Sequence, residues 1–320
     1  MFPVTRMRRT RRNEQIRDLF SEVSVDRNRM VMPVFIDETI NGKEPISSMP
    51  GIFRYSYDSY KQYITDLDAI GVKSVLFFGI PKLKDSIGSA AYDSDGIVQR
   101  SIAYAKENTD LVAMADLCMC EYTDHGHCGI LSGTEVDNDN TLESYRKIAK
   151  SYAQAGVDVI APSGMMDGQV GEIRDELDLN GFKDTIIMAY SSKFASSMYG
   201  PFRDAAQSTP GFGDRKSYQM DFRNSDQAMR EIELDIYEGA DIVMIKPALF
   251  YLDLIERARS RFEMPIAAYN VSGEYSMIKN AISSGLVSES VIGESLTSIF
   301  RAGADIVISY FTESLYRSKA

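Results

Sequence analysis

The sequence predicts a single (β/α)8 TIM barrel with an extended N-terminal arm. Eight short apolar runs, rich in β-branched residues, are each followed by a longer polar segment with helical spacing. Runs buried on both faces and separated by helix-length segments are typical of a parallel sheet built from strand–helix units. Because no linker divides the eight runs, a closed barrel is favoured over a doubly wound sheet.

The predicted strands follow one another along the whole chain. In order, they lie at 30–36, 74–80, 111–119, 157–162, 185–190, 242–245, 265–269 and 306–310. Four of the junctions leading into them repeat nearly the same phrase, at 69–72, 155–158, 238–241 and 302–305. The glycine in each phrase supplies the left-handed cap that ends a helix, so a strand is expected to start directly afterwards.

The charge is divided between the start of the chain and the rest. The 320 residues carry 46 acidic and 35 basic side chains, a formal net charge of −11. Residues 1–17 hold six arginines against one glutamate, a charge of +5, which leaves −16 for the remainder. We expect residues 1–25 to form an arm that serves oligomerisation, and residues 26–320 to form one catalytic barrel.

Composition excludes several classes of protein. A chain this acidic has no general reason to bind nucleic acid or an anionic membrane surface. No uninterrupted apolar stretch reaches the 18 residues of a membrane span, and the start lacks the apolar run of a secretory signal. We therefore expect a cytoplasmic protein with no nucleic-acid or membrane partner. Three cysteines in so long a chain argue against a disulfide framework.

Those three cysteines gather after the third predicted strand. Cys118, Cys120 and Cys128 lie within eleven residues that also contain both histidines, His125 and His127. Side chains alternate along a strand, so Asp116, Cys118 and Cys120 are expected on one face, and a turn can return Cys128 to them. Three thiolates suit a tetrahedral zinc ion with one open position, the arrangement of a catalytic zinc. The histidines are second-rank candidates for ligands, loop ordering or proton transfer.

Two apolar runs end on lysine. Lys193 follows the fifth run and Lys246 follows the sixth. A lysine at the end of a strand in a barrel mouth is partly desolvated, which lowers its pKa, and a second lysine nearby lowers it further. This is how a Schiff-base nucleophile toward a ketone or aldehyde is made.

Several polar residues near the predicted mouth are candidates for binding carboxylates. Arg203 and Arg215 lie in the long stretch after the fifth run, where an arginine suits bidentate carboxylate binding. Ser272 comes after the seventh run and Tyr310 ends the eighth, and their hydroxyls are candidates for a second carboxylate.

The sequence closely resembles the porphobilinogen synthase (5-aminolevulinate dehydratase) family, from about Arg8 to Tyr310. The resemblance rests on Asp116-x-Cys118-x-Cys120 with His125-Gly126-His127-Cys128-Gly129, on Ala161-Pro162-Ser163 with Met165-Met166-Asp167-Gly168, on Lys193-Phe194-Ala195-Ser196, on Tyr199-Gly200-Pro201-Phe202-Arg203-Asp204, on Gly213-Asp214-Arg215-Lys216-x-Tyr218-Gln219, on Met244-Ile245-Lys246-Pro247 and on Val271-Ser272-Gly273-Glu274.

The resemblance implies a lyase of tetrapyrrole and heme biosynthesis. It would condense two 5-aminolevulinate molecules asymmetrically to porphobilinogen, with loss of two waters. Lys193 and Lys246 would form Schiff bases with the two ketones, and the three cysteines would hold a catalytic zinc. Asp116 would orient the substrate amine or move protons. One carboxylate would bind to Arg203 and Arg215 with help from Gln219, and the other to Ser272 and Tyr310.

The resemblance also implies an assembly and a second metal. Members resemble one another in forming homo-octamers, with an arm that wraps a neighbouring subunit, and many have an allosteric magnesium ion, for which the matching residue here is Glu231. The chain departs from the pattern of many members at Gly164 and Gln169, where a carboxylate and a cation are absent.

Two other functions remain open on sequence grounds. A single-lysine aldolase on the same barrel would need one Schiff base and no thiolate metal site. A zinc-binding structural or regulatory barrel without activity would hold its metal in a closed site of four ligands.

Overall fold

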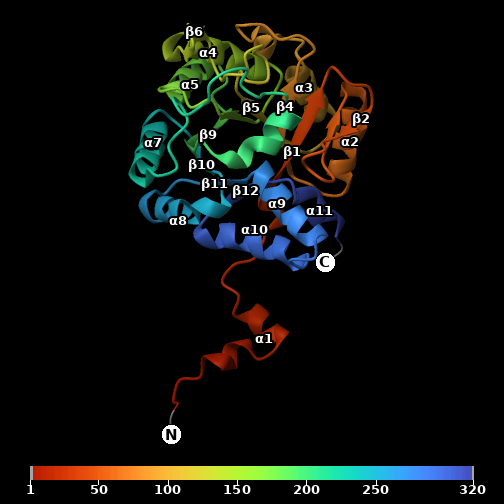
Figure 1. Cartoon of the computed structure of the whole chain (residues 1–320), viewed down its shortest axis with the longest axis vertical. Coiled ribbons are helices and arrows are strands. Elements are labelled where there is room, and N and C mark those ends of the chain that lie inside the picture. Colours follow the sequence, from red (N-terminus) through yellow and green to blue (C-terminus); the bar gives the residue numbers. More distant parts are fainter. Residues whose placement is uncertain (1–2, 319–320) are drawn as a thin grey trace.

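A computed structural model, which describes residues 3–318, contains the predicted closed parallel barrel (Figure 1). The strands run in the spatial order β1, β4, β5, β8, β9, β10, β11 and β12, and β12 pairs with β1 to close the ring. Their bounds are Met30–Asp37, Ser74–Ile80, Val112–Leu117, Val159–Pro162, Ile186–Lys193, Ile242–Lys246, Ile266–Asn270 and Ile306–Ser309. All eight predicted strands are confirmed, with ends that shift by a few residues.

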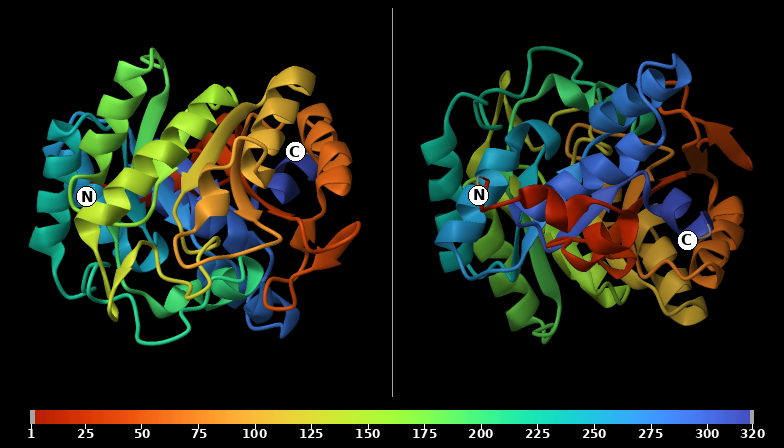
Figure 2. Two further views of the ribbon diagram at one scale, coloured as in Figure 1. Left: turned by 90° about the horizontal axis from the view of Figure 1, so that it is seen from above. Right: turned by 90° about the horizontal axis from the view of Figure 1, so that it is seen from below.

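Helices form a ring around the strands of the barrel (Figure 1), and helices also cover it in the views from above and from below (Figure 2). The main helices are α2 (Tyr57–Ala69), α3 (Ile97–Asn108), α4 (Asn138–Gln154), α5 (Gln169–Leu179), α7 (Ser225–Tyr237), α8 (Leu252–Arg261), α9 (Ser272–Ser283), α10 (Ser290–Ala302) and α11 (Thr312–Arg317). Short pieces interrupt this pattern: β2 (Lys43–Pro45) with β3 (Phe53–Tyr55), β6 (Leu131–Ser132) with β7 (Glu135–Val136), and the helix α6 (Gly200–Ala205).

The repeated glycine phrase lies at the amino-terminal ends of the barrel strands. Gly71, Gly156, Gly239 and Gly303 have φ angles of +93°, +91°, +101° and +119°, the left-handed conformation that ends each preceding helix. Three of the phrases continue into an aspartate whose carboxylate accepts a backbone N–H bond from the neighbouring strand. Asp158 accepts from Ala113 at 2.8 Å, Asp241 from Ile187 at 2.8 Å and Asp305 from Ile266 at 2.9 Å. The phrase therefore both stops a helix and links adjacent strands.

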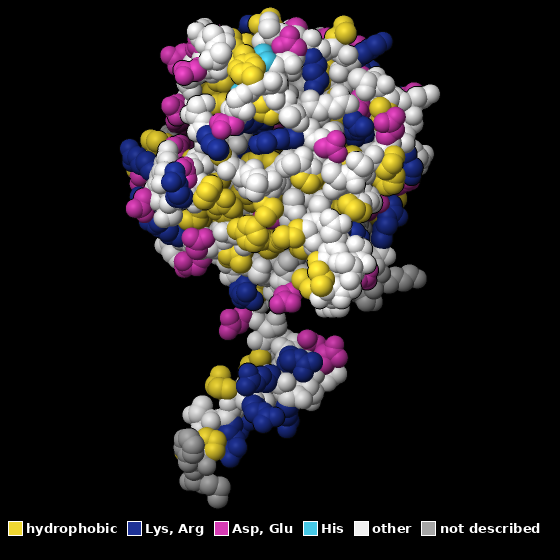
Figure 3. All heavy atoms as spheres, viewed as in Figure 1, with side chains coloured by type: hydrophobic (Ala, Val, Ile, Leu, Met, Phe, Trp, Pro, Cys, Tyr) yellow, Lys and Arg dark blue, Asp and Glu magenta, His cyan; other side chains and the backbone are white. Residues whose placement is uncertain are grey.

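The N-terminal segment lies apart from the barrel (Figure 1). It contains a 3₁₀ turn at Met7–Arg11 and the short helix α1 (Glu14–Leu19), and neither has a buried residue. Basic side chains gather along this segment in the space-filling view (Figure 3). Across residues 3–318, no helix combines the length and apolar character needed to cross a membrane.

Candidate active site

The carboxyl ends of the strands enclose a small buried cavity at the mouth of the barrel. Its volume is about 10 Å³, room for about one water molecule. Acidic, basic, thiol and aromatic side chains share this space: Asp116, Cys120, Glu121, Ser163, Lys193, Tyr199, Phe202, Arg203, Arg215 and Lys246. Six residues predicted from the sequence therefore meet in one place.

The two lysines are held side by side by an irregularity in β9. Lys246 is the register partner of Lys193, although Val243 pairs with Ala189 earlier in the same ladder. Two residues of β9, Tyr190 and Ser191, therefore face a single residue of β10, which is the geometry of a bulge. With strict alternation, Tyr190 and Lys193 would point to opposite faces, but both meet near the lysine amines.

Aromatic rings surround the amine of Lys246. Its Nζ lies 4.4 Å from the ring centre of Tyr269 and 4.8 Å from that of Tyr190, and the rings of Tyr199 and Phe202 are each 5.3 Å away. Burial, together with the charge of Lys193, lowers the pKa of Lys246 to about 7. A large fraction of this amine is therefore unprotonated near neutral pH, as a Schiff-base nucleophile requires.

Lys193 is hydrogen-bonded to the residue that follows β8. Its Nζ donates to the carbonyl oxygen of Ser163 at 2.5 Å, and the Ser163 hydroxyl donates to Asp116 at 2.9 Å. The other carboxylate oxygen of Asp116 has no hydrogen-bond partner among the described residues. Burial raises the pKa of Asp116, while the two lysines oppose that rise. Asp116 thus presents a free oxygen beside both amines.

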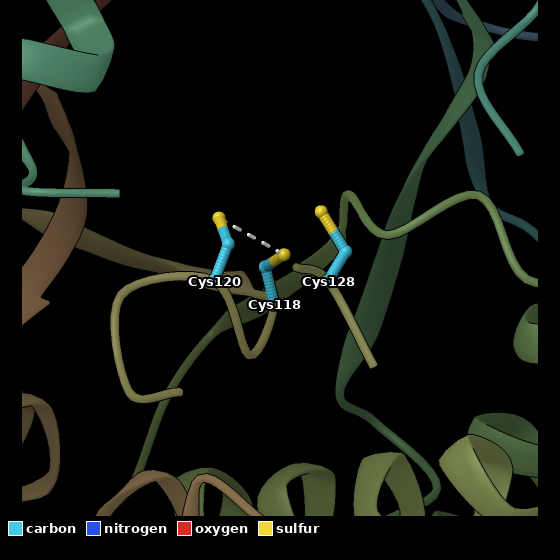
Figure 4. A group of neighbouring side chains, drawn as sticks. All are labelled: Cys118, Cys120 and Cys128. Atoms are coloured by element: carbon cyan, nitrogen blue, oxygen red, sulfur yellow. Dashed lines mark hydrogen bonds between the residues drawn. The ribbon is translucent and has the colours of Figure 1, made fainter. Parts of the chain in front are cut away.

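The three cysteines form a compact buried group (Figure 4). Their sulfur atoms all lie within 4.8 Å of one another, and those of Cys118 and Cys120 are 3.4 Å apart. The route to this arrangement differs from the prediction, because β5 ends at Leu117 and both cysteines lie in the turn that follows. The turn, rather than strand alternation, brings their sulfurs together.

These sulfurs fit a soft divalent metal ion. Burial raises the pKa of the Cys118 thiol, whereas hydrogen bonds with Cys118 and Cys120 hold the pKa of Cys128 well below its usual value. A set of three buried sulfur donors favours zinc over magnesium or calcium, which prefer oxygen.

Glu121 is a buried acid that the sequence reasoning did not single out. One carboxylate oxygen lies 3.2 Å from the sulfur of Cys120, and the other has no hydrogen-bond partner among residues 3–318. Burial raises its pKa well above the usual range. The available signal was a charged residue directly after Cys120 in a segment otherwise expected to be buried.

The two predicted arginines cover the cavity from the side of α6. Arg203 lies on α6 and is half-buried, and Arg215 lies in the following loop and is buried. Arg215 donates to the carbonyl oxygens of Gly126 at 2.9 Å and Ser208 at 2.5 Å. The Nε atoms of both arginines have no partner among the described residues, so each retains a donor for an anion.

Ser272, Tyr310 and Gln219 do not line this cavity. The Ser272 hydroxyl accepts a hydrogen bond from the backbone N–H of Phe202 at 2.9 Å, and the hydroxyls of Tyr310 and Tyr269 are 3.1 Å apart. Gln219 is buried, and its amide atoms have no partner within residues 3–318. Their contact with substrate stays a prediction. For Ser272 it requires the hydroxyl to give up the bond that it donates to the Met198 carbonyl oxygen at 3.4 Å.

Glu231 lines a second, larger cavity of about 520 Å³ outside the barrel mouth. Asp167, Gln169, Gln219 and Asp235 line it as well. Burial and the neighbouring Asp167 raise the pKa of Glu231. The structure therefore separates the predicted magnesium residue from the lysines and cysteines.

The histidines order the loop between the cysteines. The ring of His127 is within 3.1 Å of both the Tyr218 hydroxyl and the Phe212 carbonyl oxygen, and His125 contacts the Ser86 carbonyl at 3.2 Å. With both ring nitrogens engaged, His127 is positioned as a loop-ordering residue.

Comparison with known proteins identifies one family. The sequence model of the family described as "Delta-aminolevulinic acid dehydratase" matches residues 4–318. A curated protein of that name from Methanothermus sociabilis is 55% identical over 314 residues, covering 98% of each chain. Another, from Methanothermobacter thermautotrophicus, is 53% identical over 316 residues, covering 98% of this chain and 97% of the relative.

A solved structure agrees with these matches. It is delta-aminolevulinic acid dehydratase (porphobilinogen synthase) from Toxoplasma gondii ME49 in complex with the reaction product porphobilinogen. The two chains are 39% identical and superpose with a TM-score of 0.96, covering 99% of this chain and 92% of that one. The likeness extends over the barrel as a whole.

Proposed function

The chain belongs to the delta-aminolevulinic acid dehydratase family, and we propose from this premise how its barrel mouth condenses two 5-aminolevulinate molecules to porphobilinogen. The protein is a lyase of porphyrin and heme biosynthesis. The observation that supports the assignment of residues is that the paired Lys193 and Lys246 line one cavity with Cys120, which belongs to the cluster of three buried cysteines.

Each lysine acts on one substrate ketone. The unprotonated amine of Lys246 adds to the ketone carbon, and loss of water leaves an imine. Lys193 does the same to the second substrate. Two adjacent amines suit a reaction in which two copies of one ketone must be held together, because fixed neighbours react with a large effective concentration.

The cysteines hold a zinc ion through Cys118, Cys120 and Cys128. When bound, zinc supplies a Lewis acid or a source of hydroxide at the second substrate. The chain's own acids act beside it. The free oxygen of Asp116 accepts a hydrogen bond from a substrate amine and keeps that amine oriented toward the lysines.

The arginines and hydroxyls bind the substrate carboxylates. Arg203 and Arg215, with Gln219, take one carboxylate, while Ser272 and Tyr310 take the other. A cavity of about 10 Å³ cannot admit either substrate, so α6 and the loop that follows it must move aside first. The Ser272 hydroxyl binds the carboxylate as a donor, so its proton turns away from the Met198 carbonyl oxygen, to which it donates at 3.4 Å, while the bond from the Phe202 N–H can persist.

Assembly, magnesium binding and location complete the proposal. A homo-octamer is formed with the help of the N-terminal arm of residues 1–25, and the barrel of residues 26–320 is the catalytic unit. Glu231 binds an allosteric magnesium ion, and the protein is cytoplasmic.

The direct test is incubation with 5-aminolevulinate, followed by a colorimetric assay for the pyrrole. Borohydride reduction of the reacting mixture, with peptide mapping, should label both Lys193 and Lys246. A chelator should stop pyrrole formation and added zinc should restore it. If no pyrrole appears with zinc restored, or only one lysine is labelled, the proposed mechanism is wrong.

A further inference from the structure

The three cysteines do not come from one rigid piece of the fold. Cys118 and Cys120 follow β5 directly, so the barrel fixes their positions. Cys128 lies farther along, in the loop that leads to β6. Its position therefore depends on whatever holds that loop.

Helix α4 holds the loop. The hydroxyl of Tyr145 donates to the carbonyl oxygen of Cys128 at 2.8 Å, and the side chain of Thr141 accepts from the backbone N–H of Ile130 at 2.9 Å. The backbone N–H of Asp137, the residue that caps the helix, donates to the Ile130 carbonyl at 2.8 Å. Three hydrogen bonds thus join the segment 128–130 to α4 and the residue that caps it.

Close packing against α4 and β7 allows only glycine at position 129. A Cβ atom on Gly129 would lie 2.3 Å from the Thr141 hydroxyl and 2.7 Å from a methyl carbon of Val136. Both distances are shorter than real Cβ contacts, so the loop approaches the helix as closely as a bare backbone allows.

Gly164 opens the space in which the Tyr145 hydroxyl lies. A Cβ atom at this position would be 1.6 Å from that hydroxyl and 2.6 Å from the ring carbon that carries it. Tyr145 is fully buried, so it has no open space into which to retreat. Gly164 also directly follows Ser163, whose carbonyl accepts the hydrogen bond from Lys193.

We propose that Tyr145 is the positioning residue for Cys128 and sets the zinc affinity of the three-cysteine site. Its hydroxyl fits beside Cys128 because Gly164 has no side chain. This inference rests on the proposed binding of zinc by these cysteines. Tyr145 donates to the carbonyl oxygen of Cys128, so it fixes the orientation of that residue without touching the metal or the substrate.

The expected size of the effect follows from the behaviour of other metal sites. Residues that orient a metal ligand through a hydrogen bond usually contribute about 10- to 100-fold to the affinity for the metal. Tyr145→Phe keeps the ring and removes only the hydroxyl. We expect it to weaken zinc binding by about 10-fold or more.

Tyr60→Phe is a matched control. Tyr60 is also fully buried, and its hydroxyl donates to the carbonyl oxygen of Ser101 at 2.8 Å, a bond that joins α2 to α3 and not to the cysteine loop. Both variants lose one buried phenol-to-carbonyl hydrogen bond, so both should lose similar thermal stability. Zinc affinity, measured by competition with a chromophoric chelator, should fall only in Tyr145→Phe. Equal affinities in the two variants would overturn the proposal.

Gly164→Ala gives a second test that keeps the tyrosine. Its methyl group displaces the Tyr145 hydroxyl, so zinc affinity should fall in the same direction. In the double variant with Tyr145→Phe the hydrogen bond is already absent, and the alanine should weaken zinc binding much less than it does alone. Fully additive losses would contradict a shared mechanism.

Zinc binding by the wild-type chain distinguishes a failure of this inference from a failure of the proposed function. If it binds one zinc per subunit and Tyr145→Phe matches it, only the role of Tyr145 is wrong. If the wild-type chain binds no zinc, the zinc site and this inference are both wrong.

Discussion

Lys193 and Lys246 lie directly opposite each other on β9 and β10 because β9 carries one extra residue just before its lysine. Ser192 turns outward and donates to the carbonyl oxygen of Ala228 on α7, so the next side chain points into the barrel. Without the bulge, Ser192 rather than Lys193 would be the register partner of Lys246. A local irregularity thereby creates the pair of amines on which the proposed chemistry depends.

This pairing makes the reactivity of Lys246 dependent on pH and on Lys193. The Lys246 amine must lose its proton to react, so imine formation should rise with pH through about 7 and then level off. Lys193→Gln removes the neighbouring positive charge, which raises the pKa of Lys246 and moves the rise to higher pH. The carboxyl group of Asp116 remains beside the amine, and it acts to raise the pKa of Lys246.

The measurement is borohydride trapping of 5-aminolevulinate at Lys246 across a pH series, quantified by mass spectrometry. Lys216→Gln is the control, because Lys216 is an exposed lysine paired with Asp214. It should leave the profile unchanged. A Lys193→Gln profile that coincides with the wild type would show that the two amines do not interact.

Arg215 should contribute mainly to substrate binding. Arg215→Lys keeps the charge but removes the planar fork needed for bidentate carboxylate recognition. Charge-assisted hydrogen bonds contribute roughly 1.5–3 kcal/mol, so KM should rise about 10-fold or more, with a smaller change in kcat. Arg223→Lys, an exposed arginine paired with Asp221, should change neither constant. A large fall in kcat with KM unchanged would reassign Arg215 to the chemical step.

The architecture could be predicted from local sequence features. Apolar runs determine where strands form, and Gly71, Gly156, Gly239 and Gly303 end helices because of their own backbone conformation. Both signals are contained within a few neighbouring residues, which is why the order and number of barrel strands agree with the prediction.

The site was less predictable where distant segments meet. Alternation along a strand predicted that Cys118 and Cys120 lie on one face. In the structure β5 ends at Leu117, and the turn that follows brings the two sulfur atoms together. Neither the bulge before Lys193 nor the space left by Gly164 for Tyr145 has a local pattern, since each depends on a partner from another element. Glu121 went unnoticed for the same reason, because its burial results from packing around the cysteines.

Glu231 should mediate any effect of magnesium on activity. Glu231→Gln removes the negative charge that would attract a hard cation, so magnesium should no longer stimulate pyrrole formation, while basal activity persists. Since burial raises the pKa of Glu231, magnesium binding should also weaken as pH falls and the carboxyl becomes protonated.

Glu233→Gln is the control for this experiment. Glu233 lies on the same helix but pairs with Arg230 and Arg261, so its loss should leave magnesium stimulation intact. Retained stimulation in Glu231→Gln would place the effect of magnesium elsewhere.

The N-terminal arm should be needed for assembly rather than for the stability of the barrel. Its helical pieces bury none of their residues against the barrel, and Val4, Met7, Leu19 and Phe20 expose more than half of their surface. Exposed apolar side chains beside six arginines suit contact with another subunit whose surface is acidic. Deletion of residues 1–17 should therefore lower the mass measured by light scattering and leave the melting temperature of the monomeric barrel unchanged.

A full-length variant in which serine replaces the six arginines separates the contribution of charge from that of the apolar side chains. A mass as large as that of the wild type would assign assembly to the apolar residues. A mass as small as that of the deletion variant would assign it to charge. A truncated chain with the mass of the wild type would show that the arm has no part in assembly.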